Sequence, residues 1–182
     1  PAGGNTLTQS GYITVKGLPA SKITLTGNDT ICAGDTAKMS ANSGTGFSYQ
    51  WRLGPNIIPG ATSQNYNTTA NGTYRVIVTN ANGCSRTSAP VKIVKSIVAA
   101  SVTPAGPLTV CPPATVTLNA NTGTGLTYQW KKNGNNITGA TAANYTTNKA
   151  GSYKVQVTNS AGCTKVSNTV QVTVLCRQGN DL

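Results

Sequence analysis

The sequence predicts an all-β protein built from two tandem β-sandwiches. Three observations lead to this prediction: an internal repeat, short segments in which apolar residues alternate with polar ones, and turn signals between those segments. The repeat needs no gap, because one constant offset relates Trp51 to Trp130 and Tyr74 to Tyr153. Self-similarity at a fixed period indicates one structural unit used twice. The 182 residues suffice for two domains of about 80 to 100 residues each.

The strands are expected where apolar residues fall at every second position, because successive side chains of a strand point to opposite faces. Residues 36–41 show this pattern first, and a turn over residues 80–83 closes a hairpin later in the same copy. Helical periodicity is absent, and short strands separated by turns are typical of a sandwich. The apolar positions expected to share a face within each strand are Ala37, Met39 and Ala41, then Phe47, Tyr49 and Trp51, then Tyr74, Val76 and Val78, and finally Val91 and Ile93.

A tryptophan on the third strand and a Gly-x-Tyr at the start of a later strand resemble the immunoglobulin I-type pattern. The resemblance implies an immunoglobulin-like sandwich with Trp51 and Trp130 in its cores. Tyr74 and Tyr153 would form the tyrosine corner, in which the hydroxyl bonds back to the backbone. The chain departs from the pattern at the usual inter-sheet disulfide, where both copies carry small apolar residues: Ala41 and Val76 in the first, Ala120 and Val155 in the second.

The cysteines fit a second resemblance. Cys32-Ala33-Gly34 precedes the second strand of the sandwich, and Gly83-Cys84 follows the tyrosine-corner strand. These motifs resemble the immunoglobulin-like repeats of large extracellular Bacteroidetes proteins, which include adhesins and polysaccharide-degrading enzymes exported by type IX secretion. The second copy carries Cys111-Pro112-Pro113 and lacks the glycine. The resemblance covers roughly residues 21–176 and implies a secreted or cell-surface location.

Four segments are expected: 1–20 as the end of a preceding module with its linker, 21–97 and 98–176 as two immunoglobulin-like domains, and 177–182 as a linker tail. Residues 11–15 look like the last strand of the preceding module. The chain opens without the pattern of a signal peptide, so a fragment or mature form is expected. No run of about 18 apolar residues occurs, so membrane insertion is not expected.

Five cysteines with no histidine and no C-x-x-C favour disulfides in an oxidising compartment over a zinc site. Two arrangements stay open. Repeat symmetry suggests Cys32–Cys84 and Cys111–Cys163. In the expected topology, however, the first pair lies at opposite ends of the sandwich, roughly 20 Å apart, whereas a disulfide needs Cα atoms within about 7 Å. The other arrangement is Cys111–Cys176 with Cys32–Cys163, the latter stapling the two modules.

Catalysis is not expected. The chain has no histidine and no glutamate, and its only acids are Asp29, Asp35 and Asp181. General acid–base chemistry needs a positioned group of this kind, and glycoside hydrolysis needs a carboxylate pair. The same scarcity of carboxylates argues against a calcium site, and no cofactor is expected.

The net charge of +11 comes from 14 basic and 3 acidic residues. The basic residues are scattered, and their tightest group is the pair Lys131-Lys132. A nucleic-acid surface usually shows a basic cluster or stripe. The charge therefore favours a weakly charged surface that lacks acids, and a nucleic-acid partner is not expected.

The first functional hypothesis is a structural spacer that works beside neighbouring domains of the same polypeptide. The alternative is adhesion or polysaccharide binding through loops that contain Arg52, Lys131 and Lys132. Every aromatic residue except Tyr12 sits at a repeat-matched position, and matched aromatics are more often core than ligand platform. Separately, the Asp-Thr-apolar triplets resemble Bacteroidetes O-glycosylation acceptors, which makes Thr30 and Thr36 candidate modification sites.

Overall fold

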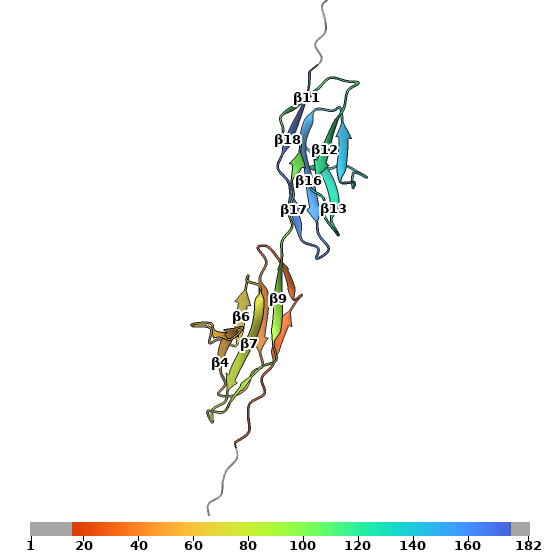
Figure 1. Ribbon diagram of the computed structural model, residues 1–182. Helices are drawn as coiled ribbons and strands as arrows, with labels where there is room; N and C mark the ends of the chain where they lie inside the picture. Colours follow the sequence, from red (N-terminus) through yellow and green to blue (C-terminus); the bar gives the residue numbers. More distant parts are fainter. Residues whose placement is uncertain (1–15, 176–182) are drawn as a thin grey trace, which may run out of the picture. The chain divides into compact units, whose positions relative to one another are not determined.

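A computed structural model describes residues 16–175. The strand expected over residues 11–15, the tail and Cys176 lie outside the described residues. All regular structure within 16–175 is β-strand (Figure 1). The described residues accordingly contain no helix that is long and apolar enough to span a membrane.

The described chain divides into two compact units. Unit 1 comprises residues 16–29, Ala37–Thr68 and Gly72–Ile93, and unit 2 comprises Thr30–Thr36, Thr69–Asn71 and residues 94–175. The sequence repeats follow strand order, with β1–β9 in the first repeat and β10–β18 in the second. The short strand β2 and the end of β9 thus count with unit 2 although their sequence belongs to the first repeat.

Two sheets form the sandwich of the first repeat. One has the antiparallel order β1-β3-β6, and the other has the order β2-β9-β7-β4-β5, with β8 also paired to β7. The strands are β1 (Ile23–Thr26), β2 (Thr30–Cys32), β3 (Ala37–Ala41), β4 (Ser48–Leu53), β5 (Asn56–Ile57), β6 (Asn65–Thr68), β7 (Gly72–Thr79), β8 (Ser85–Thr87) and β9 (Val91–Ser96).

The second repeat has the same topology. Its smaller sheet has the order β10-β12-β15, and its larger sheet has the order β11-β18-β16-β13-β14, with β17 paired to β16. The strands are β10 (Val102–Thr103), β11 (Leu108–Val110), β12 (Val116–Ala120), β13 (Thr127–Lys132), β14 (Asn135–Asn136), β15 (Asn144–Thr147), β16 (Gly151–Thr158), β17 (Thr164–Val166) and β18 (Val170–Val174). The predicted all-β fold of two tandem immunoglobulin-like sandwiches is confirmed.

One feature of both larger sheets was not predicted. The strand at the edge, β2 or β11, runs parallel to the last strand of its repeat, β9 or β18. In the first repeat Thr30 pairs with Val94 and Cys32 pairs with Ser96. Strand β2 is too short to show alternation, and its partner lies at the opposite end of the repeat in sequence.

Alternation determines which side chains fill the cores. Strand β7 shows this most clearly, because Tyr74, Val76 and Val78 are all buried while the residues between them are less buried. Trp51 and Trp130 are fully buried. The positions that hold the disulfide in the immunoglobulin pattern are buried apolar residues in both repeats: Ala41, Val76, Ala120 and Val155.

The tyrosine hydroxyls are satisfied by the strands that face them. Tyr74 lies 2.8 Å from Thr68 Oγ1, and Tyr153 lies 3.0 Å from Thr147 Oγ1. Tyr153 also donates to the backbone carbonyl of Lys149 at 2.9 Å, which is the backbone contact of a tyrosine corner.

Candidate functional site

The most distinctive local structure is the turn between β16 and β17, which orients Cys163. The amide of Asn159 donates to the Cys163 carbonyl at 3.0 Å, and the amide of Gly162 donates to the Asn159 carbonyl at 2.9 Å. The side-chain oxygen of Asn159 accepts the Cys163 amide at 3.0 Å. Gly162 has φ of 80°, a conformation that favours glycine. The turn therefore holds the cysteine backbone by hydrogen bonds on both sides.

Strand β2 brings the second cysteine to this turn. Cys32 ends β2 and pairs in register with Ser96 at the end of β9. The Ser96 hydroxyl accepts a hydrogen bond from Asn159 Nδ2 at 2.9 Å. One asparagine thus orients Cys163 with its oxygen and contacts the residue beside Cys32 with its nitrogen.

These two cysteines form a disulfide inside unit 2, with a Cα–Cα distance of 5.3 Å and an S–S distance of 2.05 Å. Cys163 is only 2% exposed. Of the two arrangements considered from sequence, the structure contains the Cys32–Cys163 bond and not the symmetric Cys32–Cys84 bond. The reason is topological. Cys84 lies next to β8, which pairs with the C-terminal end of β7, whereas Cys32 pairs with Ser96 at the end of β9 that lies beyond the N-terminal end of β7.

The remaining cysteines differ in setting. Cys84 is half-buried and forms no disulfide with any described residue. Cys111 is exposed immediately after β11, whose last residue, Val110, pairs with Val174. Cys176, which follows soon after Val174, lies outside the described residues, so the pairing of Cys111 with Cys176 stays a prediction.

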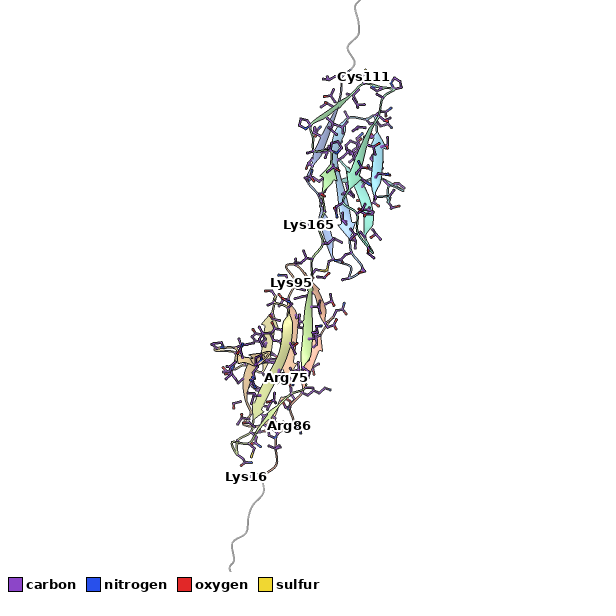
Figure 2. The ribbon with its side chains drawn as sticks, in the orientation of Figure 1. Lys16, Arg75, Arg86, Lys95, Cys111 and Lys165 are labelled. Atoms are coloured by element: carbon purple, nitrogen blue, oxygen red, sulfur yellow. A yellow bond between two sulfur atoms is a disulfide. The ribbon has the colours of Figure 1, made fainter. Side chains whose placement is uncertain are left out.

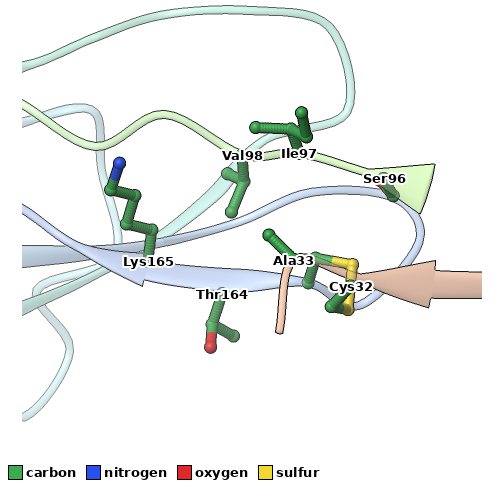
Figure 3. A pocket seen from close by; sticks show the side chains of 8 residues that line it. Cys32, Ala33, Ser96, Ile97, Val98, Thr164 and Lys165 are labelled. Carbon is green, nitrogen blue, oxygen red and sulfur yellow. A yellow bond between two sulfur atoms is a disulfide. The ribbon is translucent and has the colours of Figure 1, made fainter. Parts of the chain in front are cut away.

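A shallow cavity of about 290 Å³ adjoins the disulfide in unit 2 (Figure 3). The S–S bond and Ala33 lie at one end, and Lys165 lies at the other. The lining offers one cation and several small side chains, but no carboxylate or imidazole that could transfer a proton. The lining residues are Cys32, Ala33, Ser96, Ile97, Val98, Cys163, Thr164 and Lys165. Across residues 16–175, His, Cys, Asp and Glu form no group of three or more that could hold a metal ion.

The basic residues singled out from sequence lie on strands, which corrects their expected place in loops. Arg52 is in β4, and Lys131 and Lys132 are in β13. Each strand forms a short hairpin with the next, β4 with β5 and β13 with β14. The sequence predicted loops at these positions because the second strand of each hairpin is too short to show an alternating pattern.

The sheet register places like charges opposite one another at matched positions of the two repeats. Arg52 is paired with Arg75 across β4 and β7, and Lys131 is paired with Lys154 across β13 and β16. Figure 2 labels Arg75 in unit 1. Like charges directly opposite in an antiparallel sheet are destabilising. The sequence did not predict these pairs, because the partners are far apart along the chain and become neighbours only through the register of the paired strands.

Nearby groups occupy part of the hydrogen-bonding capacity of these cations. Arg52 donates from NH2 to the Pro55 carbonyl, while its buried Nε has no hydrogen-bond partner among the described residues. Lys131 Nζ donates to Asn136 Oδ1 at 2.8 Å. Lys132 Nζ lies 5.9 Å from the centroid of the Tyr153 ring, within the range of a cation–π contact.

The aromatic side chains are directed inward. None of those within residues 16–175 is exposed, and the two tryptophans and the corner tyrosines are buried. Tyr66 stacks on Trp51 with ring centroids 5.4 Å apart, and Tyr145 stacks on Trp130 at 5.8 Å. Burial raises the pKa of Tyr66, and the neighbouring Tyr74 raises it further. No described aromatic forms an exposed platform for a sugar ring.

The two candidate O-glycosylation sites have different surroundings. Thr36 is exposed immediately before β3. Thr30 is half-buried in β2, where it pairs with Val94. Modification stays a prediction at both, and Thr36 is the more accessible acceptor.

The fold and the site define a tandem immunoglobulin-like module protein with a disulfide between half-buried Cys32 and buried Cys163. The chain belongs to the family described as domain of unknown function DUF8696, whose model matches residues 21–96 and 100–176. No curated protein matches the sequence.

Solved structures show the same fold at low sequence identity. The extracellular domains 3–5 of Drosophila OTK are 22% identical, with a TM-score of 0.52, covering 87% of this chain and 63% of that one. Three N-terminal domains of the bacteriophage RB49 highly immunogenic outer capsid protein are 18% identical, with a TM-score of 0.46, covering 85% of this chain and 59% of that one. The chain therefore spans less than two thirds of either structure. The likeness to the OTK domains shows the fold alone.

Proposed function

We propose that this chain is a non-catalytic, extracellular pair of immunoglobulin-like modules that acts as a structural spacer or accessory region of a larger secreted or cell-surface protein. The observation that carries the proposal is the burial of the large aromatic side chains in the two cores. Trp51, Trp130, Tyr74 and Tyr153 are at most 1% exposed. Side chains that could have formed a ligand platform serve instead to fill two small cores.

The Cys32–Cys163 disulfide supports the extracellular part of the proposal. Structural disulfides persist in oxidising environments and are rare where cellular thiols keep cysteines reduced. Together with the cysteine motifs, it favours the proposed kinship with repeats of secreted Bacteroidetes proteins exported by type IX secretion. In this proposal the domains span 21–97 and 98–176, and their partners are the neighbouring domains of the polypeptide.

The cation pairs favour a second candidate function, adhesion to an acidic polysaccharide. Each pair costs stability through like-charge repulsion, yet both repeats carry one at the same sheet position. An anionic group bound between the two side chains would remove that cost. The buried Arg52 Nε is a further donor without a partner among the described residues.

Retention on insoluble polysaccharides separates the two functions. The chain is applied to neutral and acidic polymers, and bound protein is measured at increasing salt. For a spacer we expect no retention on neutral polymers and only salt-sensitive retention on acidic ones, because exposed charges are screened. Tight retention that survives high salt would overturn the spacer proposal.

A matched pair of variants tests the adhesion alternative. Lys131→Gln with Lys154→Gln removes one cation pair, while Lys22→Gln with Lys149→Gln removes the same charge from positions elsewhere on the surface. Adhesion through the pair predicts that the first double variant loses retention on an acidic polymer and the second retains it. Equal losses would show that only net charge matters.

A further inference from the structure

The hydrogen-bonded turn that holds Cys163 occurs a second time, in unit 1, around Cys84. The Asn80 amide donates to the Cys84 carbonyl at 3.0 Å, and the Gly83 amide donates to the Asn80 carbonyl at 2.9 Å. Asn80 Oδ1 accepts the Cys84 amide at 3.0 Å. These are the same bonds, at the same lengths, as those around Cys163. The turn that presents a disulfide-bonded cysteine in unit 2 thus presents a thiol in unit 1.

The segment facing each turn also corresponds. In unit 2, Asn159 Nδ2 donates to Ser96 Oγ at 2.9 Å. In unit 1, Asn80 Nδ2 donates to the carbonyl of Gly17 at 3.0 Å, and Gly17 is the residue that matches Ser96 in the repeat. The backbone carbonyl takes the place of the hydroxyl that glycine lacks. Cys84 Sγ lies 4.0 Å from the carbonyl of Lys16, and Figure 2 shows Lys16 and Arg86 toward the same end of unit 1.

Most residues that line the cavity beside the disulfide have matched positions in the sequence of unit 1. Those positions are Gly17, Leu18, Pro19, Cys84, Ser85 and Arg86. The lining residues without a matched position within this sequence are Cys32 and Ala33. Cys163 is buried against Cys32, whereas Cys84 is only half-buried. Within the described residues, unit 1 therefore repeats the turn and its contact with the facing segment, and it lacks the strand end that supplies the second sulfur.

We propose that Cys84 forms a disulfide with a cysteine of a further immunoglobulin-like repeat that precedes the first one in the parent polypeptide. The partner cysteine then stands beside Gly17, as Cys32 at the end of β2 stands beside Ser96. Successive repeats are then linked by a chain of equivalent disulfides. The inference goes beyond a spacer role, because it assigns Cys84 a covalent partner and makes the bond a property of the array.

The reaction is an ordinary oxidation of two thiols by a small-molecule disulfide such as oxidised glutathione. The partner thiolate first attacks glutathione disulfide, forming a mixed disulfide and releasing one glutathione thiolate. Cys84 thiolate then attacks the partner sulfur of that mixed disulfide and releases the second glutathione. Two thiols lose two electrons, and one glutathione disulfide becomes two glutathiones.

An extended chain tests the proposal. Residues 1–94 are joined directly to residues 16–182, which duplicates the first repeat at its natural junction. This places a copy of Cys32 ahead of Cys84 at the same separation of 131 residues that Cys32 has from Cys163. In the added repeat Cys84 is replaced by serine, so that only one Cys84 remains. The protein is refolded with oxidised and reduced glutathione, alkylated without reduction, digested and mapped by mass spectrometry.

We expect a Cys32–Cys84 linked peptide together with the Cys32–Cys163 peptide, and loss of Cys84 alkylation relative to the original chain. The control carries Cys32→Ser in the added repeat only, and there Cys84 should be alkylated again. The Cys32–Cys163 peptide reports correct folding within each sample. If that peptide forms while Cys84 stays alkylated, the proposal is wrong. It is equally wrong if the Cys32–Cys84 peptide persists in the control, or if Cys84 instead links two copies of the chain.

Discussion

The indole Nε1 of Trp51 donates a hydrogen bond to the carbonyl oxygen of Ser63 at 2.9 Å, from a side chain that is fully buried. Trp130 makes the equivalent bond to Ala142 at 3.0 Å. The indole thus fills the centre of each sandwich and also ties the larger sheet to the segment before the last strand of the smaller one.

Replacing Trp51 by Phe should destabilise the first sandwich. The variant loses the hydrogen bond and leaves unfilled volume, and we expect a loss of about 2 kcal/mol, below the roughly 3–5 kcal/mol typical of Trp→Ala. Urea denaturation followed by circular dichroism measures the change. Ser48→Ala, at an exposed position of the same strand, is the control. An unchanged unfolding midpoint would contradict the central role of the indole.

Tyr153, Thr147 and Lys149 form a small closed network. The Lys149 amide donates to Thr147 Oγ1 at 3.1 Å, that oxygen lies 3.0 Å from the Tyr153 hydroxyl, and the hydroxyl donates to the Lys149 carbonyl at 2.9 Å. We expect Tyr153→Phe to cost about 1–2 kcal/mol of stability. Because Thr147→Val breaks the same network, the double variant should cost clearly less than the sum. Additive costs in a double-mutant cycle would mean that the groups act independently.

Much of the fold could be predicted from sequence because burial in a strand follows a period of two. That rule alone places Tyr74, Val76 and Val78 on one inward face. The internal repeat then predicts the second sandwich. The parallel pairing of β2 with β9 was not predictable in this way. Thr30–Cys32 is too short to carry a pattern, and its position depends on hydrogen bonds to a strand that ends at Ser96.

The candidate sites depend on register, which composition and spacing do not reveal. Arg52 and Arg75 look unrelated in sequence and become neighbours only through the β4–β7 pairing. Likewise, the sequence offered both Cys84 and Cys163 as partners of Cys32 but could not select between them. That selection needs the contact of Asn159 with Ser96, which stands in register with Cys32.

The disulfide should contribute to the stability of the native state. Only one of its two cysteines is buried, because Cys163 is 2% exposed whereas Cys32 is half-buried and lines the cavity. We expect Cys32→Ala with Cys163→Ala to lower the free energy of unfolding by about 2–5 kcal/mol, since the bond joins cysteines with a sequence separation of 131 residues. Denaturation of the double variant is compared with Cys84→Ala, which breaks no described disulfide. Equal midpoints for the two variants would contradict this prediction.

The stacked tyrosines should make the protein lose stability at alkaline pH. Burial, and then the neighbouring corner tyrosine, raises the pKa of Tyr66 and of Tyr145 above the usual value near 10. The folded state therefore holds these protons more tightly than the unfolded state. The resulting stabilisation is complete below the unfolded pKa and is lost as pH rises through the higher folded pKa.

The window to measure therefore begins near about pH 10 and extends upward. Urea denaturation at several pH values should show a declining free energy of unfolding for the wild-type chain. Tyr66→Phe with Tyr145→Phe should flatten that decline, because phenylalanine keeps the ring without a titrating proton. Tyr49→Phe with Tyr128→Phe removes two other tyrosine hydroxyls, leaves the stacked tyrosines in place and is the control variant. If both double variants decline as the wild-type chain does, the stacked tyrosines contribute nothing to the alkaline loss.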